Sequence, residues 1–190
     1  MLFKESLTES YGFVVYYASN TWKQPLEQVL QKQEISSDWR QFYRLREPSL
    51  PVVGPLPEHI TLGRINEAML ADSTLVNRQD LFEEIHSESP SLEHFFRQNF
   101  GFCAQDGHQL VAWCLAEYHY QGRYELGIET IKAYRRKGIA THLASAVIRH
   151  AWASGATEIG WDCWATNTPS IATALKLGFE KVLDYPVYYG

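Results

Sequence analysis

The 190-residue chain carries a net charge of −5, with 45% hydrophobic and 21% charged residues. These values describe a globular protein that can bury one core and is too short to predict two independent domains. The acidic balance disfavours general nucleic-acid binding, and the absence of a long apolar run or signal pattern predicts a cytoplasmic protein without membrane association.

The cysteines and histidines give no metal or disulfide pattern. The three cysteines, Cys103, Cys114 and Cys163, are far apart and form no Cys-x-x-Cys pair, so we expect reduced core residues. The seven histidines form no His-x-x-x-His pair, and we predict no metal site.

The chain opens with a predicted strand and helix. Residues 11–18 are aromatic and β-branched and end at Ser19-Asn20, which is typical of a strand followed by a turn. Pro25 then suits the first turn of a helix with a short apolar stripe at Leu26, Val29 and Leu30.

A second apolar helical face and a proline-rich connector follow. The face consists of Trp39, Phe42, Tyr43 and Leu45. The connector contains Pro48, Pro51, Pro55 and Pro57, each of which fixes φ and removes a hydrogen-bond donor. We interpret residues 1–57 as an N-terminal accessory portion and residues 58–190 as the core, together one compact unit.

Residues 60–63 predict the first strand of that core. Helical segments are then expected up to residue 100, on apolar residues with helical spacing. These residues are Ile65, Ala68, Met69, Phe82, Ile85, Leu92, Phe95 and Phe96. Gly101 is placed to end the last of these helices in the left-handed conformation.

The next region predicts a three-stranded meander. Residues 102–104 and 110–115 flank Asp106-Gly107, a dipeptide that favours a tight hairpin because it tolerates positive φ. Gln121-Gly122 makes a second turn, and residues 124–131 form the third strand.

This third strand leads into a basic, glycine-containing loop at residues 134–138. An apolar stripe through Ile139, Leu143, Val147 and Ala151 then predicts a helix that stops at Ser154-Gly155. The first amides of a helix have no intrahelical partner and lie at the positive end of the peptide dipoles. The junction therefore predicts a phosphate site, with Gly138 allowing close backbone approach.

After this helix, residues 158–164 predict a parallel strand. Thr168-Pro169 starts another helix that stops at Gly178, and a final strand begins at residues 179–182. The sequence contains neither a Gly-x-x-x-x-Gly-Lys-Ser/Thr loop nor a Gly-x-Gly-x-x-Gly loop, so the predicted anion is a diphosphate of another kind.

Two motifs resemble the GNAT acetyltransferases. The spacing Arg135-x-x-Gly138-x-Ala140 resembles the family's pyrophosphate-binding motif, and Asn167-x-x-Ser170 with Lys176-Leu177-Gly178-Phe179 resembles its second cofactor motif. The tail from Trp161 to Tyr188 looks most like the zwittermicin-resistance-type branch. The resemblance implies an α/β (α+β-like) fold: a mixed, mostly antiparallel sheet with splayed strands and flanking helices.

The resemblance also implies that acetyl-CoA is the acyl donor. Backbone atoms near the end of the third strand would pair with the pantetheine arm, and the loop amides would bind the diphosphate. Asn167 and Ser170 would contact the arm, although capping of the following helix also explains Asn167. The predicted donor-binding residues are Glu129, Thr130, Ile131, Arg135, Arg136, Lys137, Gly138, Ile139, Ala140, Thr141, Asn167 and Ser170.

Glu129 is the predicted general base, because a carboxylate close to the loop could accept the proton of an attacking amine. Glu125, Glu117 and Asp162 are the alternatives. Many relatives have a tyrosine two residues before Lys176 that protonates the leaving thiolate, whereas this chain has Ala174. Tyr185, Tyr188 and Tyr189 are the remaining candidates for that role.

Three functions are compatible with these features. The first is an N-acetyltransferase that moves an acetyl group directly from acetyl-CoA to a primary amine of a small molecule or peptide, without nucleic acid or membrane partners. The second is a non-catalytic acyl-CoA-binding or sensing module, which the missing tyrosine favours. The third is an interaction domain using surface aromatic residues. The oligomeric state is left open, a homodimer included.

Overall fold

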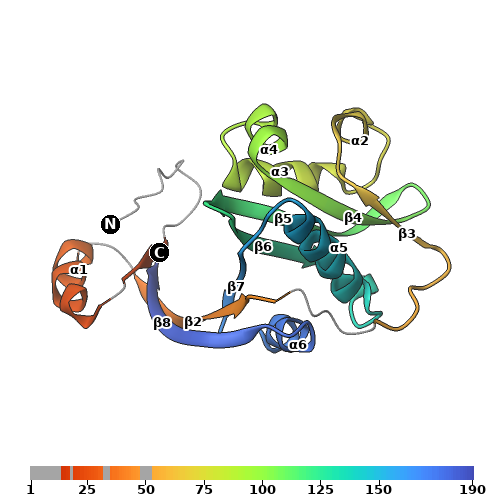
Figure 1. The fold of residues 1–190 in the computed structure, drawn as a ribbon. Helices are drawn as coiled ribbons and strands as arrows, with labels where there is room; N and C mark the ends of the chain where they lie inside the picture. The colour runs from red at the N-terminus through yellow and green to blue at the C-terminus, as the bar shows by residue number, and fades with distance from the viewer. Residues whose placement is uncertain (1–13, 18, 32–34, 48–52) are drawn as a thin grey trace.

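A computed structural model describes residues 14–17, 19–31, 35–47 and 53–190. Within these residues, eight strands form one sheet in the order β1-β8-β2-β7-β6-β5-β4-β3. Neighbouring strands are antiparallel except β6 and β7, which are parallel. The predicted fold class, a mixed and mostly antiparallel sheet with flanking helices, is confirmed (Figure 1). No helix of the described residues is long and apolar enough to span a bilayer.

The strands and helices alternate along the chain as follows. The strands are β1 (Val14–Tyr16), β2 (Ser36–Leu45), β3 (Ile60–Arg64), β4 (Phe100–Asp106), β5 (Gln109–Tyr120), β6 (Arg123–Thr130), β7 (Glu158–Trp164) and β8 (Glu180–Tyr189). The α-helices are α1 (Lys23–Leu30), α2 (Glu67–Ala71), α3 (Arg78–Glu88), α4 (Leu92–Gln98), α5 (Ile139–Ala153) and α6 (Thr168–Lys176). Two 3₁₀ turns are η1 (Asn20–Trp22) and η2 (Lys132–Tyr134).

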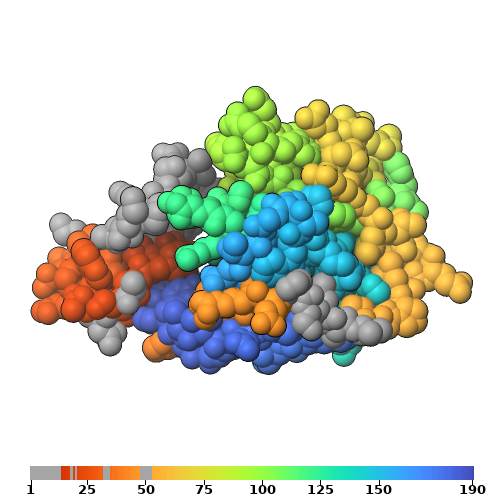
Figure 2. All heavy atoms as spheres, viewed as in Figure 1, coloured from red at the N-terminus to blue at the C-terminus, as the bar shows by residue number. Residues whose placement is uncertain are grey.

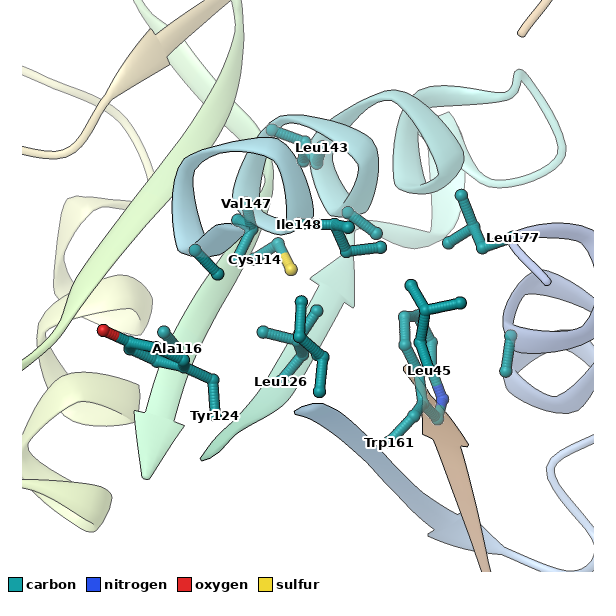
Figure 3. Close-up of a cluster of buried hydrophobic side chains, with 14 of the residues drawn as sticks. Leu45, Cys114, Ala116, Tyr124, Leu126, Leu143, Val147, Ile148, Trp161 and Leu177 are labelled. Atoms are coloured by element: carbon teal, nitrogen blue, oxygen red, sulfur yellow. The ribbon is translucent and has the colours of Figure 1, made fainter. Parts of the chain in front are cut away.

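Helix α5 builds the larger core on one face of the sheet. Its apolar stripe, which includes Leu143, Val147 and Ile148, is fully buried against side chains of β5, β6 and β7 (Figure 3). Leu126 of β6 and Trp161 of β7 belong to the same cluster. Since successive side chains of a strand alternate between faces, the odd-numbered residues of β6 point to the opposite face.

Helices α2, α3 and α4 cover that opposite face near β4 and β5. Leu81, Ile85 and Phe95 of α3 and α4 are buried there with Trp113 and Leu115 of β5. The odd-numbered residues of β6 therefore lie on the side of α3. This second core fixes α3 beside the strands that line the site described below.

The N-terminal part of the chain enters the sheet. Residues 36–45 form β2, a strand between β7 and β8, so the expected helical face at Trp39, Phe42, Tyr43 and Leu45 is wrong. The alternation of apolar and polar residues in β2 is irregular because apolar side chains lie on both faces: Phe42 lines the cleft, whereas the adjacent Tyr43 is buried in the core. Figure 2 shows this orange segment lying against the dark blue C-terminal segment.

The predicted strand at residues 11–18 is described only in part, because residues 11–13 and 18 lie outside the described residues. The described part, β1, pairs with β8 at the edge of the sheet. Pro48 and Pro51 of the predicted connector also lie outside the described residues.

The predicted turns and the meander are confirmed, but Gly101 has another role. Gly107 and Gly122 adopt φ of 55° and 77° in the hairpin turns. Gly101 lies within β4, opposite Leu115, and does not end a helix. A Cβ built there would lie 2.6 Å from Leu115 Cδ2 and 2.8 Å from Ile65 Cδ1, so the position is glycine for lack of space.

Gly101→Ala should therefore destabilise the protein by about 1–3 kcal/mol, the usual cost of overpacking a core. Gly63→Ala in β3 is the matched control, because a Cβ at Gly63 has no neighbour within 4 Å. Urea unfolding of both variants measures the difference. Equal stabilities for the two variants would contradict this packing.

Candidate active site

The parallel strands β6 and β7 pair only at one end. Their register runs from Arg123 opposite Glu158 to Leu126 opposite Trp161 and then stops. Beyond this point β6 stays paired with β5 as far as Thr130, while β7 stays paired with β2 as far as Trp164. The two strands therefore separate within a continuous sheet. We call the place where they separate the fork.

A cleft of about 1370 Å³ occupies the fork. On β6 it is lined by Glu125, Gly127 and Ile128, and on β7 by Asp162 and Cys163. Because alternate residues of a strand point to opposite faces, this lining comes from both faces of the sheet. The cleft therefore borders both faces of the sheet.

The free edge of β6 presents backbone groups to this cleft. Ile131 N–H donates to Val111 O of β5 at 3.0 Å, so the backbone of Ile131 is turned away from the fork. Hydrogen-bonding directions alternate along a strand edge, which turns Thr130 and Ile128 toward the fork. Of the three predicted strand residues, Thr130 is therefore the one whose N–H faces the fork, while its carbonyl oxygen already accepts a hydrogen bond from Arg135 Nε.

The loop after β6 has the amide geometry that its sequence predicts. In the described part of the chain, the amides of residues 136–141 have no hydrogen-bond acceptor, and the first bond of α5 is from His142 N–H to Gly138 O. Gly138 has φ of 78°, and a Cβ there would have no neighbour within 4 Å. The amides of Arg136, Lys137, Gly138, Ile139, Ala140 and Thr141 are thus available together to one anion.

Arg135 braces this loop against β6. Its Nε donates to Thr130 O at 2.9 Å, and its guanidinium forms an ion pair with Glu129 at 3.1 Å. Lys137 lies over the ring of Tyr134 at 4.7 Å. The Arg135 side chain is therefore turned toward β6 and links the loop to the end of that strand.

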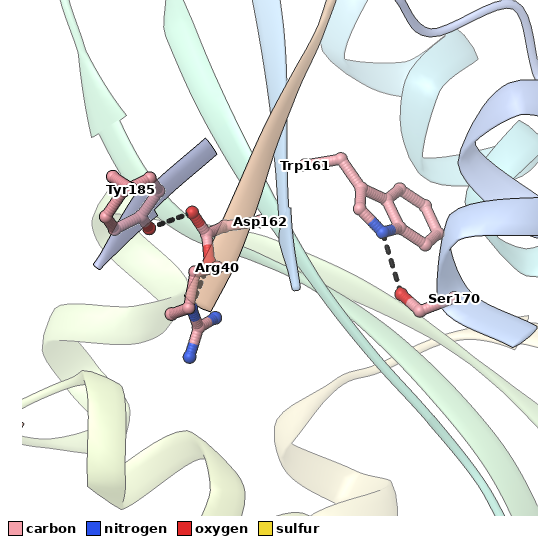
Figure 4. A network of polar contacts seen from close by, with 5 residues as sticks. All are labelled: Arg40, Trp161, Asp162, Ser170 and Tyr185. Atoms are coloured by element: carbon pink, nitrogen blue, oxygen red, sulfur yellow. Dashed lines mark hydrogen bonds and ion pairs between the residues drawn. The ribbon is translucent and has the colours of Figure 1, made fainter. Parts of the chain in front are cut away.

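Asn167 and Ser170 line the cleft where α6 begins. The Asn167 side chain caps the helix by accepting from Ser170 N–H at 3.2 Å. Ser170 Oγ accepts from Trp161 Nε1 at 2.9 Å (Figure 4). Both residues thus fix the far wall of the fork, and capping accounts for Asn167 without a ligand.

Glu129 lies outside the residues that line the cleft. Its side chain is 47% exposed and paired with Arg135. The cleft instead contains Glu117 of β5 and Glu125 of β6, with Glu84 and Glu88 of α3 beside them.

Glu125 and Glu117 have strongly perturbed acidities. Burial, together with the charges of Asp162 and Glu88, raises the pKa of Glu125 to about 7. Burial, together with the charges of Glu88, Glu84 and Glu125, raises the pKa of Glu117 to about 9. Near neutral pH, Glu125 is poised between its two forms and Glu117 holds its proton.

On the side of β7 facing these glutamates, Asp162 forms a network with Arg40 and Tyr185. Arg40 is ion-paired with Asp162, and Tyr185 donates a hydrogen bond to the same carboxylate (Figure 4). Burial and this hydrogen bond raise the pKa of Tyr185. Of the three C-terminal tyrosines predicted as acids, Tyr185 is the one that lines the cleft.

The other two tyrosines and Ala174 lie elsewhere. Tyr188 donates to Glu27 of α1 at 2.9 Å, and Tyr189 packs against Trp164. Ala174 is fully buried in the core below α6 and presents nothing to the cleft.

Sequence reasoning missed the residues that other segments bring to the cleft, notably Arg40, Glu84 and Glu88. Arg40 could have been found only by recognising β2 as a strand, and the two glutamates only by docking α3. Within the described ranges, no group of three or more His, Cys, Asp or Glu residues is arranged to hold a metal ion.

Comparison with known proteins agrees with this geometry. A family model described as GNAT acetyltransferase matches residues 2–188. An N-acetyltransferase from Bacillus subtilis, YdfB, described as uncharacterized, is 30% identical over 187 residues, covering 98% of this chain and 69% of the relative.

Solved structures have the same fold. A GCN5-related N-acetyltransferase-like protein from Streptococcus suis superposes with a TM-score of 0.68 at 20% identity, covering 92% of this chain and 70% of that protein. A tandem GNAT protein from the clavulanic acid biosynthesis pathway superposes with a TM-score of 0.62 at 14% identity, covering 100% and 62%. By its family match and its curated relative, this chain belongs to the GNAT acetyltransferase family.

Proposed function

We propose that the protein is an N-acetyltransferase that moves an acetyl group from acetyl-CoA directly to a primary amine while both are bound in the cleft. Two observations carry this proposal: the cleft at the fork between β6 and β7, and the unpaired amides of residues 136–141 in the loop into which β6 runs. Holding donor and acceptor side by side supplies much of the rate of such a transfer.

The structure supports one direction for the donor. With its diphosphate on the loop amides, the pantetheine arm would run along the free edge of β6 past Thr130 and Ile128. The strand from Ile131 back to Gly127 spans roughly 13 Å. At Leu126 the pairing with Trp161 closes the path, so the thioester would lie near Gly127.

The acceptor would enter from the side of α3. Glu84, Glu88, Glu117, Glu125 and Asp162 line the cleft there, whereas Arg40 is occupied by Asp162. With Glu117 protonated, the remaining carboxylates still outnumber Arg40 and attract a cation, and a primary amine in water is cationic. The resemblance of the C-terminal tail to the zwittermicin-resistance-type branch also favours a small-molecule amine.

Glu125 is better placed than Glu129 to accept the amine proton. It lines the cleft near the fork, with its Cγ 3.6 Å from where a Cβ of Gly160 would be, and its raised pKa suits a base at neutral pH. Glu129 remains the sequence-based prediction, but its ion pair with Arg135 gives it another use.

The alternative of a non-catalytic acyl-CoA-binding or sensing module rests on Ala174. The paired carboxyl groups in the cleft favour the enzyme, because sensing alone does not require buried titrating groups. We also propose a cytoplasmic location, which the three free, buried cysteines support.

Acetyl-CoA should raise the melting temperature of the protein, and Gly138→Asp should abolish this increase, because a carboxylate would face the diphosphate and φ of 78° disfavours a side chain. Gly155→Asp is the matched control. Gly155 has φ of 91° and open space around it, at the other end of α5. Thermal melts with and without acetyl-CoA decide the matter. An undiminished shift in Gly138→Asp would show that the loop does not hold the donor.

Glu125→Gln should lower kcat by ~10²–10⁴-fold with little change in acetyl-CoA affinity, because the amide cannot accept a proton. Wild-type kcat/KM should rise with pH through about 7, as Glu125 loses its proton. Glu129→Gln, measured in parallel on the same acceptor, separates the two assignments. A larger loss of kcat in Glu129→Gln than in Glu125→Gln would favour Glu129 as the general base and reject Glu125.

A further inference from the structure

Glu117 occupies an irregular position in β5. The register between β5 and β6 shifts there, since Ala116 pairs with Leu126 and Tyr118 pairs with Glu125, which leaves Glu117 as an extra residue. Such a bulge bends a strand and re-aims a side chain. Here it turns the Glu117 carboxyl group over β6 and into the cleft.

The carboxyl group of Glu117 lies on Gly127. A Cβ built on Gly127 would be 1.4 Å from Glu117 Oε1 and 2.2 Å from its Cδ, so no side chain fits at this position while the carboxyl group is there. Gly127 is the first residue of β6 beyond the last pair with β7. Glu117 is therefore held at the fork, where the proposed function places the thioester.

The order of groups along β6 separates two roles. A donor that enters from the loop reaches Gly127, and hence Glu117, before it reaches Glu125. An acceptor from the α3 side approaches past Glu88 and Glu125. Glu117 is thus closer to the donor, and Glu125 is closer to the acceptor.

The surroundings of Glu117 keep it protonated. Glu84 and Glu88 face it from α3 and Glu125 faces it from β6, while Arg40 of β2 is the cation that opposes them. Together with burial, these carboxylates raise its pKa to about 9. Two carboxyl groups whose environments separate their pKa values can act as acid and base in one site.

We propose that Glu117 is the general acid that protonates the sulfur of the departing thiolate. This inference rests on the proposed function. An ammonium group that enters the cleft first gives one proton to solvent. The neutral nitrogen then bonds to the thioester carbonyl carbon, the carbonyl π pair moves to oxygen and returns when the carbon–sulfur bond breaks, and Glu125 takes the second proton that the nitrogen loses. The carbon–sulfur bond then breaks, and its electron pair accepts the proton of Glu117. Transfer of one proton from Glu125 to Glu117, through solvent, restores both groups after the amide and the free thiol leave.

Other groups are less suited to this step. Ala174 has no proton to give and is buried away from the cleft. The Tyr185 hydroxyl donates to Asp162, and its pKa is raised, so it holds its proton more tightly than an unperturbed tyrosine. Glu88 accepts a hydrogen bond from Tyr118.

The test is the pH dependence of thiol release from acetyl-CoA, measured with whichever amine of a panel of diamines, polyamines, amino acids and amino sugars supports the fastest release. Wild-type kcat should fall as the pH rises through about 9, because Glu117 loses its proton. Glu117→Gln should lower kcat by ~10²-fold or more near pH 8 and should lack this fall, since the amide does not titrate. Glu93→Gln, an exposed change on α4, should keep both the rate and the fall.

A second measurement reads Glu117 without an acceptor. Carbon-13 NMR of protein labelled at glutamate carboxyl carbons, assigned with Glu117→Gln, should show one group that titrates near pH 9. Titration of Glu117 at an ordinary glutamate pKa, or an unchanged alkaline fall in Glu117→Gln, would overturn the inference. If acetyl-CoA stabilises the wild-type protein but no amine yields thiol release, the proposed function is wrong and the role of Glu117 falls with it.

Discussion

The separation of β6 from β7 after the pair Leu126–Trp161 is the constraint on which the rest of the site depends. Each strand keeps a full partner on its other edge, β5 for β6 and β2 for β7, so the sheet remains continuous while the two strands diverge. Unpaired backbone groups in a protein interior are costly unless something satisfies them. A fork in a sheet is therefore stable when it is open to solvent or to an extended ligand.

The two ends of the fork carry opposite charge. At the loop end, free helix amides and basic side chains favour an anion. At the other end, carboxyl groups from α3, β5, β6 and β7 favour a cation and raise one another's pKa. An acidic protein can therefore still present a local site that favours an anion, because local geometry outweighs the net charge of −5.

The sequence predicted well the local structure that depends on neighbouring residues. The loop with Gly138, the start of α5, the hairpin at Gly107 and the cap at Asn167 all follow from short patterns. The sequence did not show that residues 36–45 cross the sheet between β7 and β8, because such pairing joins residues far apart in the chain. Arg40 was missed for this reason.

The set of carboxyl groups that line the cleft could not be predicted from the sequence for a related reason. Spacing from the loop pointed to Glu129, but the bulge at Glu117 and the docking of α3 decide which carboxyl groups line the cleft. Neither the bulge nor the docking of α3 can be recognised from a single sequence. Gly101 shows the same limit, since a glycine needed for close packing looks like a glycine that ends a helix.

Hydrogen exchange of backbone amides, with and without acetyl-CoA, tests the central claim most directly. If the donor lies in the fork, the amides of residues 136–141 should exchange more slowly when it is bound, together with those of Ile128 and Thr130 on the free edge of β6. Ile131, already bonded to Val111, should change little. Protection confined to another surface, with residues 128–141 unchanged, would contradict the account.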